Sequence, residues 1–317
     1  MDPGCLLSKL ALPQGLVSPS LGKFFAAMSA AVIVQLNLTD PNVDGLDVAQ
    51  TSGQVLSMRL ADKYISQCFA GRHDRSYIKD ADEWTIMESF FIFSYYGNCN
   101  TSKQAWYHLR EAISFALALG LNREESYSDP SLEVNERRRR LYWLLFITER
   151  AYCLQHRTTP ILRASIALPR IYDGADEPTL SGFVKLARLF NTIDSYFVCS
   201  WSEGYLKGSN DSVARLLDPD QFSTMSLASI IDETQRVDVA VTLCWLRTLV
   251  CQLQIRSNES HGRGAATSVR AAARDLLNCF SAARLEILGS HGIGMEQKIS
   301  ILQVFSATYC PGNHQNN

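Results

Sequence analysis

The chain has 317 residues, of which 46% are hydrophobic and 20% are charged, and its formal net charge is -2 at pH 7. This length and composition are typical of a folded protein with a sizeable core, and they exclude a largely disordered chain. The slight acidic excess also disfavours a surface built to neutralise nucleic-acid phosphates. We therefore expect no direct DNA binding by this chain alone.

The N-terminus and the cysteines predict a protein that stays inside the cell. Met1–Cys5 lacks the basic start and apolar stretch of a secretory signal. The longest apolar runs, Phe90–Tyr96 and Leu141–Ile147, are far shorter than the roughly 20 residues that cross a bilayer. The nine cysteines show no spacing typical of a zinc site or a disulfide framework. We expect free thiols, no metal or other cofactor, and no membrane association.

In the first hundred residues, the spacing of apolar side chains predicts helices over about 20–34, 52–69 and 82–96. The third of these is so densely apolar that we expect it to be a central helix. Thr101–Gln104 has the pattern of a capping box, in which a hydroxyl and an amide satisfy backbone N–H groups reciprocally, so a new helix should begin there.

That new helix carries Trp106 and should stop at Gly120, because glycine suits the left-handed residue that follows a helix C-terminus. A fourth helix is predicted from Glu133 to Leu154, with a charged first half and an almost wholly apolar second half that contains Trp143. We expect this helix to run from solvent into the core.

The charged half of the fourth helix contains a run of four arginines that ends at Arg140. Glu133 and Arg137, like Glu136 and Arg140, are four residues apart and would face each other on a helix. We interpret the run as a solvated face with local ion pairs, each contributing about 0.3–0.5 kcal/mol. A DNA-contacting patch is the sharper alternative, which the acidic balance of the chain disfavours.

At the end of the apolar half, Glu149 and Arg150 form a charged pair that is costly unless each group finds a partner. We expect both to tie helices together, with the Arg150 guanidinium committed to buried acceptors.

Beyond Pro160 the chain is irregular until about Ser181, and no strand alternation competes with the helical patterns that follow. The predicted fold is all-α, an irregular multi-helix array without a detectable repeat. Further helices are predicted near 181–201, 224–256 and 265–288. The expected organisation is an N-terminal helix and polar connection (1–50), a helical regulatory domain (51–256), and a C-terminal helix with a frayed, polar tail (257–317).

Three motifs in this order resemble the fungal-specific transcription factor domain, the middle homology region of fungal binuclear zinc-cluster regulators. They are the helix that begins at Trp106 and ends in a Leu-Gly-Leu turn at Gly120, the acidic and arginine-rich opening followed by Trp143, and the Glu149–Arg150 pair. The resemblance is strongest over 81–171. The candidate structural or regulatory residues are Trp106, Gly120, Glu136, Arg139, Arg140, Trp143, Glu149, Arg150 and Arg157.

The chain departs from the family pattern at two places. The family commonly has Asp where Glu149 stands, and a Gly-Arg-Pro turn where His156–Thr158 stands, so Arg157 matches but the glycine does not. The stretch Glu149–Arg157, followed by Ser165–Pro169, is more similar to regulators of sugar and starch utilisation. The six-cysteine, two-zinc cluster of such regulators is absent from this sequence.

The resemblance implies a nuclear transcription regulator whose effector-responsive middle domain works through protein partners: the transcription machinery, an intact regulator or a second copy. A small-molecule inducer is also implied. A stand-alone helical protein that pairs with or inhibits an intact regulator is the alternative. An all-α enzyme such as a terpenoid synthase is more remote, because Asp80–Glu83 suits a helix start and no second metal motif follows. We expect no catalytic, metal-binding or DNA-binding residue.

Overall fold

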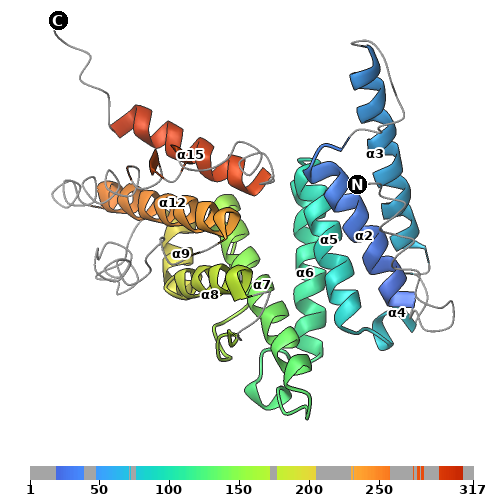
Figure 1. The fold of residues 1–317 in the computed structure, drawn as a ribbon. Coiled ribbons are helices and arrows are strands. Elements are labelled where there is room, and N and C mark those ends of the chain that lie inside the picture. The colour runs from blue at the N-terminus through green and yellow to red at the C-terminus, as the bar shows by residue number, and fades with distance from the viewer. Residues whose placement is uncertain are drawn as a thin grey trace, which may run out of the picture. The chain divides into compact units, whose positions relative to one another are not determined.

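The computed structural model describes residues 19–38, 48–70, 72, 76–171, 177–204, 230, 232–257, 274, 277–278, 280–281 and 293–309. Within these ranges the regular secondary structure is entirely helical, which confirms the predicted all-α class. The chain divides into two compact units, Met1–Gly120 and Leu121–Asn317 (Figure 1). The boundary between the two units falls inside the span 51–256, which was predicted as one domain. The predicted limits of that domain stay a prediction.

Unit 1 is a layer of helices lying lengthwise against one another (Figure 1). Helix α2 packs against both α3 and α5, and α5 packs against α6. Small residues on α2, such as Ala27 and Ala30, are fully buried and let these helices approach closely. The helices of unit 1 are α2 (Pro19–Gln35), α3 (Val48–Phe69), α4 (Ser76–Lys79), α5 (Glu83–Asn98) and α6 (Ser102–Ala118).

The capping box of unit 1 lies at the start of α5, where the sequence analysis did not place it. Asp82 Oδ1 accepts from the backbone N–H of Thr85, and Thr85 Oγ1 accepts from the N–H of Asp82. The capping box predicted at Thr101 is wrong. Thr101 precedes α6, but its hydroxyl donates back to the carbonyl of Tyr96 instead of capping the new helix.

Unit 2 buries most of the large aromatic residues that the structure describes in it, including Trp143, Phe146 and Trp245. Helix α7 packs against α8 and α9, and α12 packs against α8 and α15. Ser131 begins α7 by accepting from the N–H of Val134. The elements of unit 2 are η1 (Glu124–Ser126), α7 (Leu132–His156), α8 (Glu177–Asn191), α9 (Ser195–Glu203), α12 (Glu233–Ser257) and α15 (Ile293–Tyr309).

The predicted helices match the described ones with two differences. The pattern over 181–201 belongs to two helices, because the chain breaks between α8 and α9 and Asp194 caps the second by accepting from the N–H of Phe197. Helix α15 was not predicted. Most of the helix expected at 265–288, and residues 224–229 of the one before it, lie outside the described residues.

By length and apolar composition, Glu233–Arg256 in α12 would be long enough to cross a membrane, although 72% of its most apolar window is buried inside the protein. Burial of this kind is typical of a core helix.

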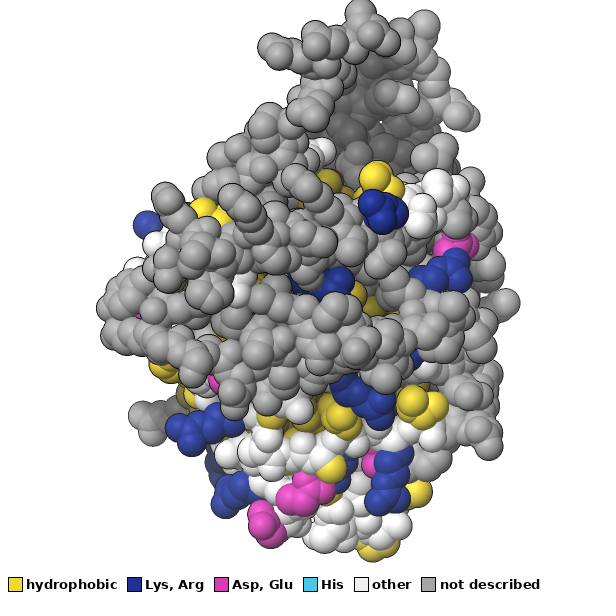
Figure 2. Space-filling model, turned by 90° about the vertical axis from the view of Figure 1, so that its left-hand side faces the viewer, with side chains coloured by type: hydrophobic (Ala, Val, Ile, Leu, Met, Phe, Trp, Pro, Cys, Tyr) yellow, Lys and Arg dark blue, Asp and Glu magenta, His cyan; other side chains and the backbone are white. Residues whose placement is uncertain are grey.

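On the face drawn in Figure 2, Lys and Arg side chains are scattered among acidic, apolar and other residues instead of gathering in one block.

Candidate functional site

Four of the nine predicted motif residues hold one extended segment against α7. This segment, residues 161–170, follows the helix without regular secondary structure, and we call it the strap. Its exposed residues alternate irregularly with buried ones, of which Leu162 and Ile166 are the apolar anchors. The polar contacts between α7 and the strap are made mainly by side chains of the helix and backbone groups of the strap.

Arg139 is the centre of the first contact. Its Nη2 and Nη1 atoms lie 2.7 and 3.0 Å from the two carboxylate oxygens of Glu124, and Nη1 also donates to the Ala167 carbonyl at 3.2 Å. Glu124 completes the loop by accepting from the N–H of Ala167. The guanidinium also lies over the ring of Tyr127, 4.2 Å from its centroid. Hydrogen bonds from Arg139 hold the pKa of Glu124 below its usual range.

Glu136 lies one turn earlier on α7 and is buried. Its carboxylate accepts from the backbone N–H of Arg170 at 2.8 Å and lies 3.8 Å from Arg139 Nε. The expected pairing with Arg140 is therefore wrong. Arg140 is half-buried and makes no hydrogen bond or ion pair with any residue that the structure describes.

Trp143 and its neighbour Tyr142 hold the middle of the strap. The indole N–H of Trp143 donates to the Ala167 carbonyl at 2.9 Å, and the Tyr142 hydroxyl donates to the Arg163 carbonyl at 2.6 Å. Both side chains are buried, which confirms that the second half of α7 enters the core. A buried indole with its N–H satisfied contributes apolar area without leaving an unmet donor.

Glu149 holds the start of the strap. Its Oε1 accepts from the N–H of Ile161 at 2.7 Å and its Oε2 accepts from the N–H of Leu162 at 2.8 Å, and the side chain is 0% exposed. Because two backbone amides solvate the carboxylate, its charge is tolerated in the interior. Glu149 was expected to tie helices together, whereas in the structure it ties α7 to the non-helical strap.

Arg150 differs from its neighbour. It is 3% exposed, yet its Nε and Nη1 atoms have no hydrogen-bond partner among the residues that the structure describes. The expectation that its guanidinium is committed to buried acceptors is wrong for these two nitrogens. The guanidinium instead lies over the face of Phe146, 4.3 Å from the ring centroid, one turn back on α7. Burial lowers the pKa of Arg150, and the charge of Glu149 acts in the opposite direction.

Arg157 ends α7 in the left-handed conformation, with φ at 53°, and its N–H donates to the Cys153 carbonyl. The left-handed residue is thus the arginine that matches the family pattern, whereas His156, where the family has glycine, is the last residue of the helix. The exposed Arg157 guanidinium lies over the ring of Trp201, 5.1 Å from its centroid. The cation–π contact links the end of α7 to α9.

Two motif residues lie in unit 1 and take no part in holding the strap. Trp106 is half-buried on α6, and the guanidinium of Arg110, one turn later, lies 4.0 Å from the centre of its indole. Gly120 has φ at 73° and is buried two residues after the end of α6, as its predicted left-handed role requires. The sequence motif therefore combines residues from both units.

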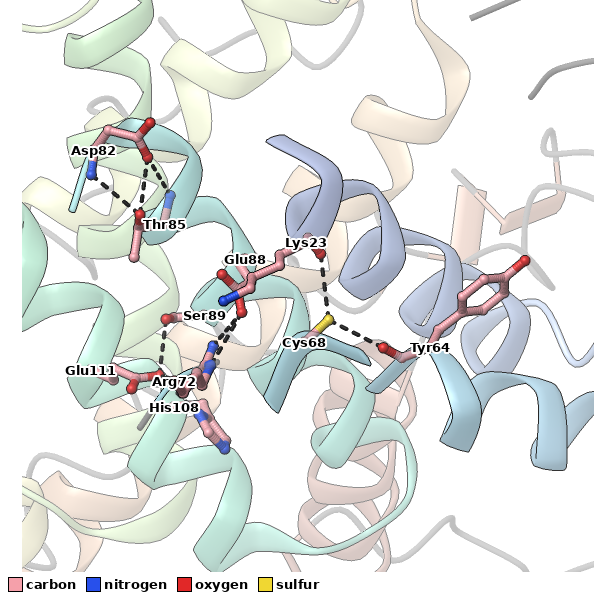
Figure 3. Close-up of polar contacts among 10 residues, drawn as sticks. All are labelled: Lys23, Tyr64, Cys68, Arg72, Asp82, Thr85, Glu88, Ser89, His108 and Glu111. Carbon is pink, nitrogen blue, oxygen red and sulfur yellow. Dashed lines mark hydrogen bonds and ion pairs between the residues drawn. The ribbon is translucent and has the colours of Figure 1, made fainter. Parts of the chain in front are cut away.

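A buried ionic cluster in unit 1 was not predicted (Figure 3). Arg72 donates to Glu88 Oε1 from Nε at 3.1 Å and from Nη2 at 2.8 Å, and its Nη1 donates to Glu111 Oε2 at 2.8 Å. Ser89 donates to the same Glu111 oxygen at 2.9 Å, and His108 Nδ1 lies 3.0 Å from it. The only sequence signal was a charged Glu88 within a densely apolar helix.

The two carboxyl groups of this cluster shift in opposite directions. Burial raises the pKa of Glu88 despite the nearby charge of Arg72. For Glu111, burial acts in the same sense, but the hydrogen bond from His108, the charge of Arg72 and the bond from Ser89 outweigh it and lower the pKa. The cluster is therefore a lock between α5, α6 and the end of α3, in which each charge depends on the others.

Among the described residues, no three His, Cys, Asp or Glu side chains are grouped as metal ligands would be. The strap contacts and the ionic cluster engage their carboxylates and guanidinium groups in fixed internal bonds. The strap contacts and the ionic cluster therefore fix the backbone path of the chain.

The model of the family described as "Fungal specific transcription factor domain" matches residues 46–204, which is half of the chain. The chain is 25% identical over 203 residues to the probable sucrose utilization protein SUC1 of Candida albicans, covering 62% of this chain and 40% of that protein. It is 24% identical over 239 residues to the maltose fermentation regulatory protein MAL33 of Saccharomyces cerevisiae, covering 73% of this chain and 50% of that protein. The chain thus spans at most half the length of these two relatives. No solved structure matches it.

Proposed function

Because this chain belongs to the family of the fungal specific transcription factor domain, we propose that it is the regulatory region of a transcription regulator of carbohydrate utilisation. The names of the relatives, which concern sucrose utilization and maltose fermentation, support the choice of target genes. The observation that carries the proposal is the strap. Four of the nine motif residues, Glu136, Arg139, Trp143 and Glu149, bind backbone groups of one segment and so build a frame.

A frame of this kind suits control better than catalysis. Its carboxylates are occupied by amides and by a guanidinium, so none is poised to act as a general base toward a substrate. We therefore propose a non-enzymatic protein that acts in the nucleus and transmits its state to the transcription machinery, to an intact regulator or to a second copy. The inducer would be a small molecule drawn from the carbohydrate metabolism that such genes serve.

The test fuses the full chain to a DNA-binding module of known target site and measures a reporter with and without maltose or sucrose. We expect output that depends on the fused chain and changes with the sugar. Glu149→Gln should abolish the change, because the amide group of Gln would oppose one of the strap N–H groups. Glu133→Gln is the matched control, since Glu133 is exposed on the first turn of the same helix.

Reporter output equal to that of the DNA-binding module alone, under every condition, would contradict the proposal. If the unfused chain lowers the output of an intact regulator, the alternative of a stand-alone inhibitor is favoured. Zinc analysis and DNA titration at controlled salt of the purified chain accompany the assay, and we expect neither metal nor sequence-specific DNA binding.

A further inference from the structure

Arg150 has a buried side chain with unmet hydrogen-bonding capacity. Only 3% of the residue is exposed, and within the described part of the chain neither Nε nor Nη1 has a hydrogen-bond partner. Arg139 lies eleven residues earlier on the same helix, about three turns back and so on nearly the same face. There the guanidinium is fully engaged by Glu124 and Ala167. The same side chain on the same helix is therefore satisfied at one end and unsatisfied at the other.

The carboxylates near Arg150 are already engaged. Glu149 uses both oxygens to accept from the N–H groups of Ile161 and Leu162, and moving either would release the start of the strap. The other carboxylate whose charge acts on Arg150 is Asp194, and its Oδ1 caps α9 by accepting from Phe197. Natural proteins keep buried polar groups bonded, so an orphaned guanidinium indicates that its acceptor comes from outside these elements.

The charges around Arg150 define what such an acceptor is. One guanidinium faces two carboxylates, Glu149 and Asp194, whose negative charges act on it. A further anion would add a third negative charge in a desolvated setting, where like charges repel strongly. An uncharged group with oxygen acceptors, such as a hydroxyl or carbonyl, would satisfy the N–H donors without this repulsion.

We propose that Arg150 is the polar anchor of a ligand site in unit 2 that accepts an uncharged, hydroxyl-bearing small molecule. The inference rests on the proposed function, because it names the residue that would hold the inducer. Phe146 fixes the guanidinium plane from one side, so the donors are preorganised before the ligand arrives. Glu149, bonded to the strap, places the ligand beside the segment whose position it would influence.

Arg150→Met is the informative variant, because methionine retains an unbranched apolar stem over Phe146 but removes every donor. In titrations of the full chain with maltose and with sucrose, we expect the wild type to bind at least one of them. Affinity should fall on the order of 10- to 100-fold in Arg150→Met, the loss of hydrogen bonds from a charged group. Without ligand, the variant should unfold at a temperature no lower than the wild type, since an unsatisfied buried charge is removed.

Arg150→Lys is the second variant and should also bind weakly, because it keeps the charge but loses the planar arrangement of donors. Arg140→Met is the matched control, a half-buried arginine on the same helix without such contacts, and should bind as the wild type does. Succinate serves as the anionic probe and should not bind.

Four results would overturn the inference: a lowered unfolding temperature in Arg150→Met, unchanged affinity in that variant, no binding of either sugar by the wild type, or tight binding of succinate. The reporter assay separates this failure from that of the proposed function. A fused Arg150→Met chain that still responds to sugar removes the site and leaves the regulatory role intact. A fused wild-type chain without any output removes the regulatory role itself.

Discussion

Two arginines, one in each unit, show how differently a guanidinium in the protein interior can be held. In unit 1, Arg72 bonds Glu88 and Glu111, and its guanidinium joins helices that are distant in sequence. In unit 2, Arg150 is more deeply buried, yet two of its nitrogens have no hydrogen-bond partner among the residues that the structure describes. A buried charge that is fully paired serves the fold, whereas one left unpaired costs stability and indicates another use. The contrast concerns the individual side chains, because Arg139 of unit 2 is engaged as fully as Arg72.

Among the variants proposed for unit 2, Trp143→Ala should cause the largest loss of stability. It removes a buried indole and its bond to the Ala167 carbonyl, so we expect a loss of about 4–5 kcal/mol in the free energy of unfolding. Urea denaturation followed by circular dichroism measures it. Trp106→Ala, which removes a half-buried tryptophan, should cost clearly less, and equal losses would show that α7 is not the core of unit 2.

Arg72→Met tests the paired arginine. Its loss leaves Glu88 buried and Glu111 with one partner fewer, so we expect a decrease of about 3–4 kcal/mol in the free energy of unfolding. Arg59→Met, at an exposed position on α3, should change stability by no more than about 0.5 kcal/mol. If Arg72→Met and Arg150→Met have the same effect on the denaturation midpoint, the distinction between the two arginines fails.

Glu149→Gln tests whether strap amides are held by a charge. The variant keeps the size of the side chain but replaces one accepting oxygen with a donor, so stability should fall by about 2–3 kcal/mol. Hydrogen exchange at Ile161 and Leu162 should accelerate together. Protection that remains at both amides in the variant would mean that the strap is fixed by its apolar anchors alone.

The ionic cluster of unit 1 should give stability a pH dependence in the acidic range. The folded pKa of Glu111 is lowered, so its contribution is present above the unfolded value of about 4.3 and is lost as the pH falls through the folded value. Glu88, whose pKa is raised, acts in the opposite sense: its contribution is present below that value and is lost as the pH rises through the folded one.

Between pH 5 and 3, Glu111→Gln should therefore flatten the loss of stability, and Glu88→Gln should steepen it, each on the order of 1 kcal/mol. Denaturation midpoints at a series of pH values measure both slopes. Parallel curves for the two variants would show that the cluster titrates as one unit.

Arg140→Met should have the smallest effect, within about 0.5 kcal/mol, because Arg140 lies beside the strap contacts but takes no part in them. A larger loss of stability, measured in the same denaturation assay, would favour the predicted local ion pair between Glu136 and Arg140.

Helix positions and the depth of α7 could be predicted from the sequence, because apolar periodicity along one segment determines both. The partners of Arg72 could not. They lie 16 and 39 residues away, and periodicity indicates which face of a helix is apolar but not which helices meet. The same limit applies to Arg139 and Glu124, whose pairing depends on how the loop before α7 folds back.

Glu149 and Arg150 show where local reasoning succeeds and where it fails. That a charge at the apolar end of α7 needs partners follows from its position, and Glu149 has them. The identical argument failed for Arg150, because it assumes that every buried charge is satisfied by the chain itself.

Because α7 binds the strap through the main-chain N–H and C=O groups of the strap, the exposed side chains of the strap contribute little to its backbone path. Ile161 and Arg163 are exposed, while α7 holds the peptide groups around them. The backbone path of such a segment is set by its contacts with α7, and its exposed side chains can be substituted without changing that path. Related proteins could therefore carry different side chains at these positions, and so present different surfaces, without any change in the buried contacts of α7.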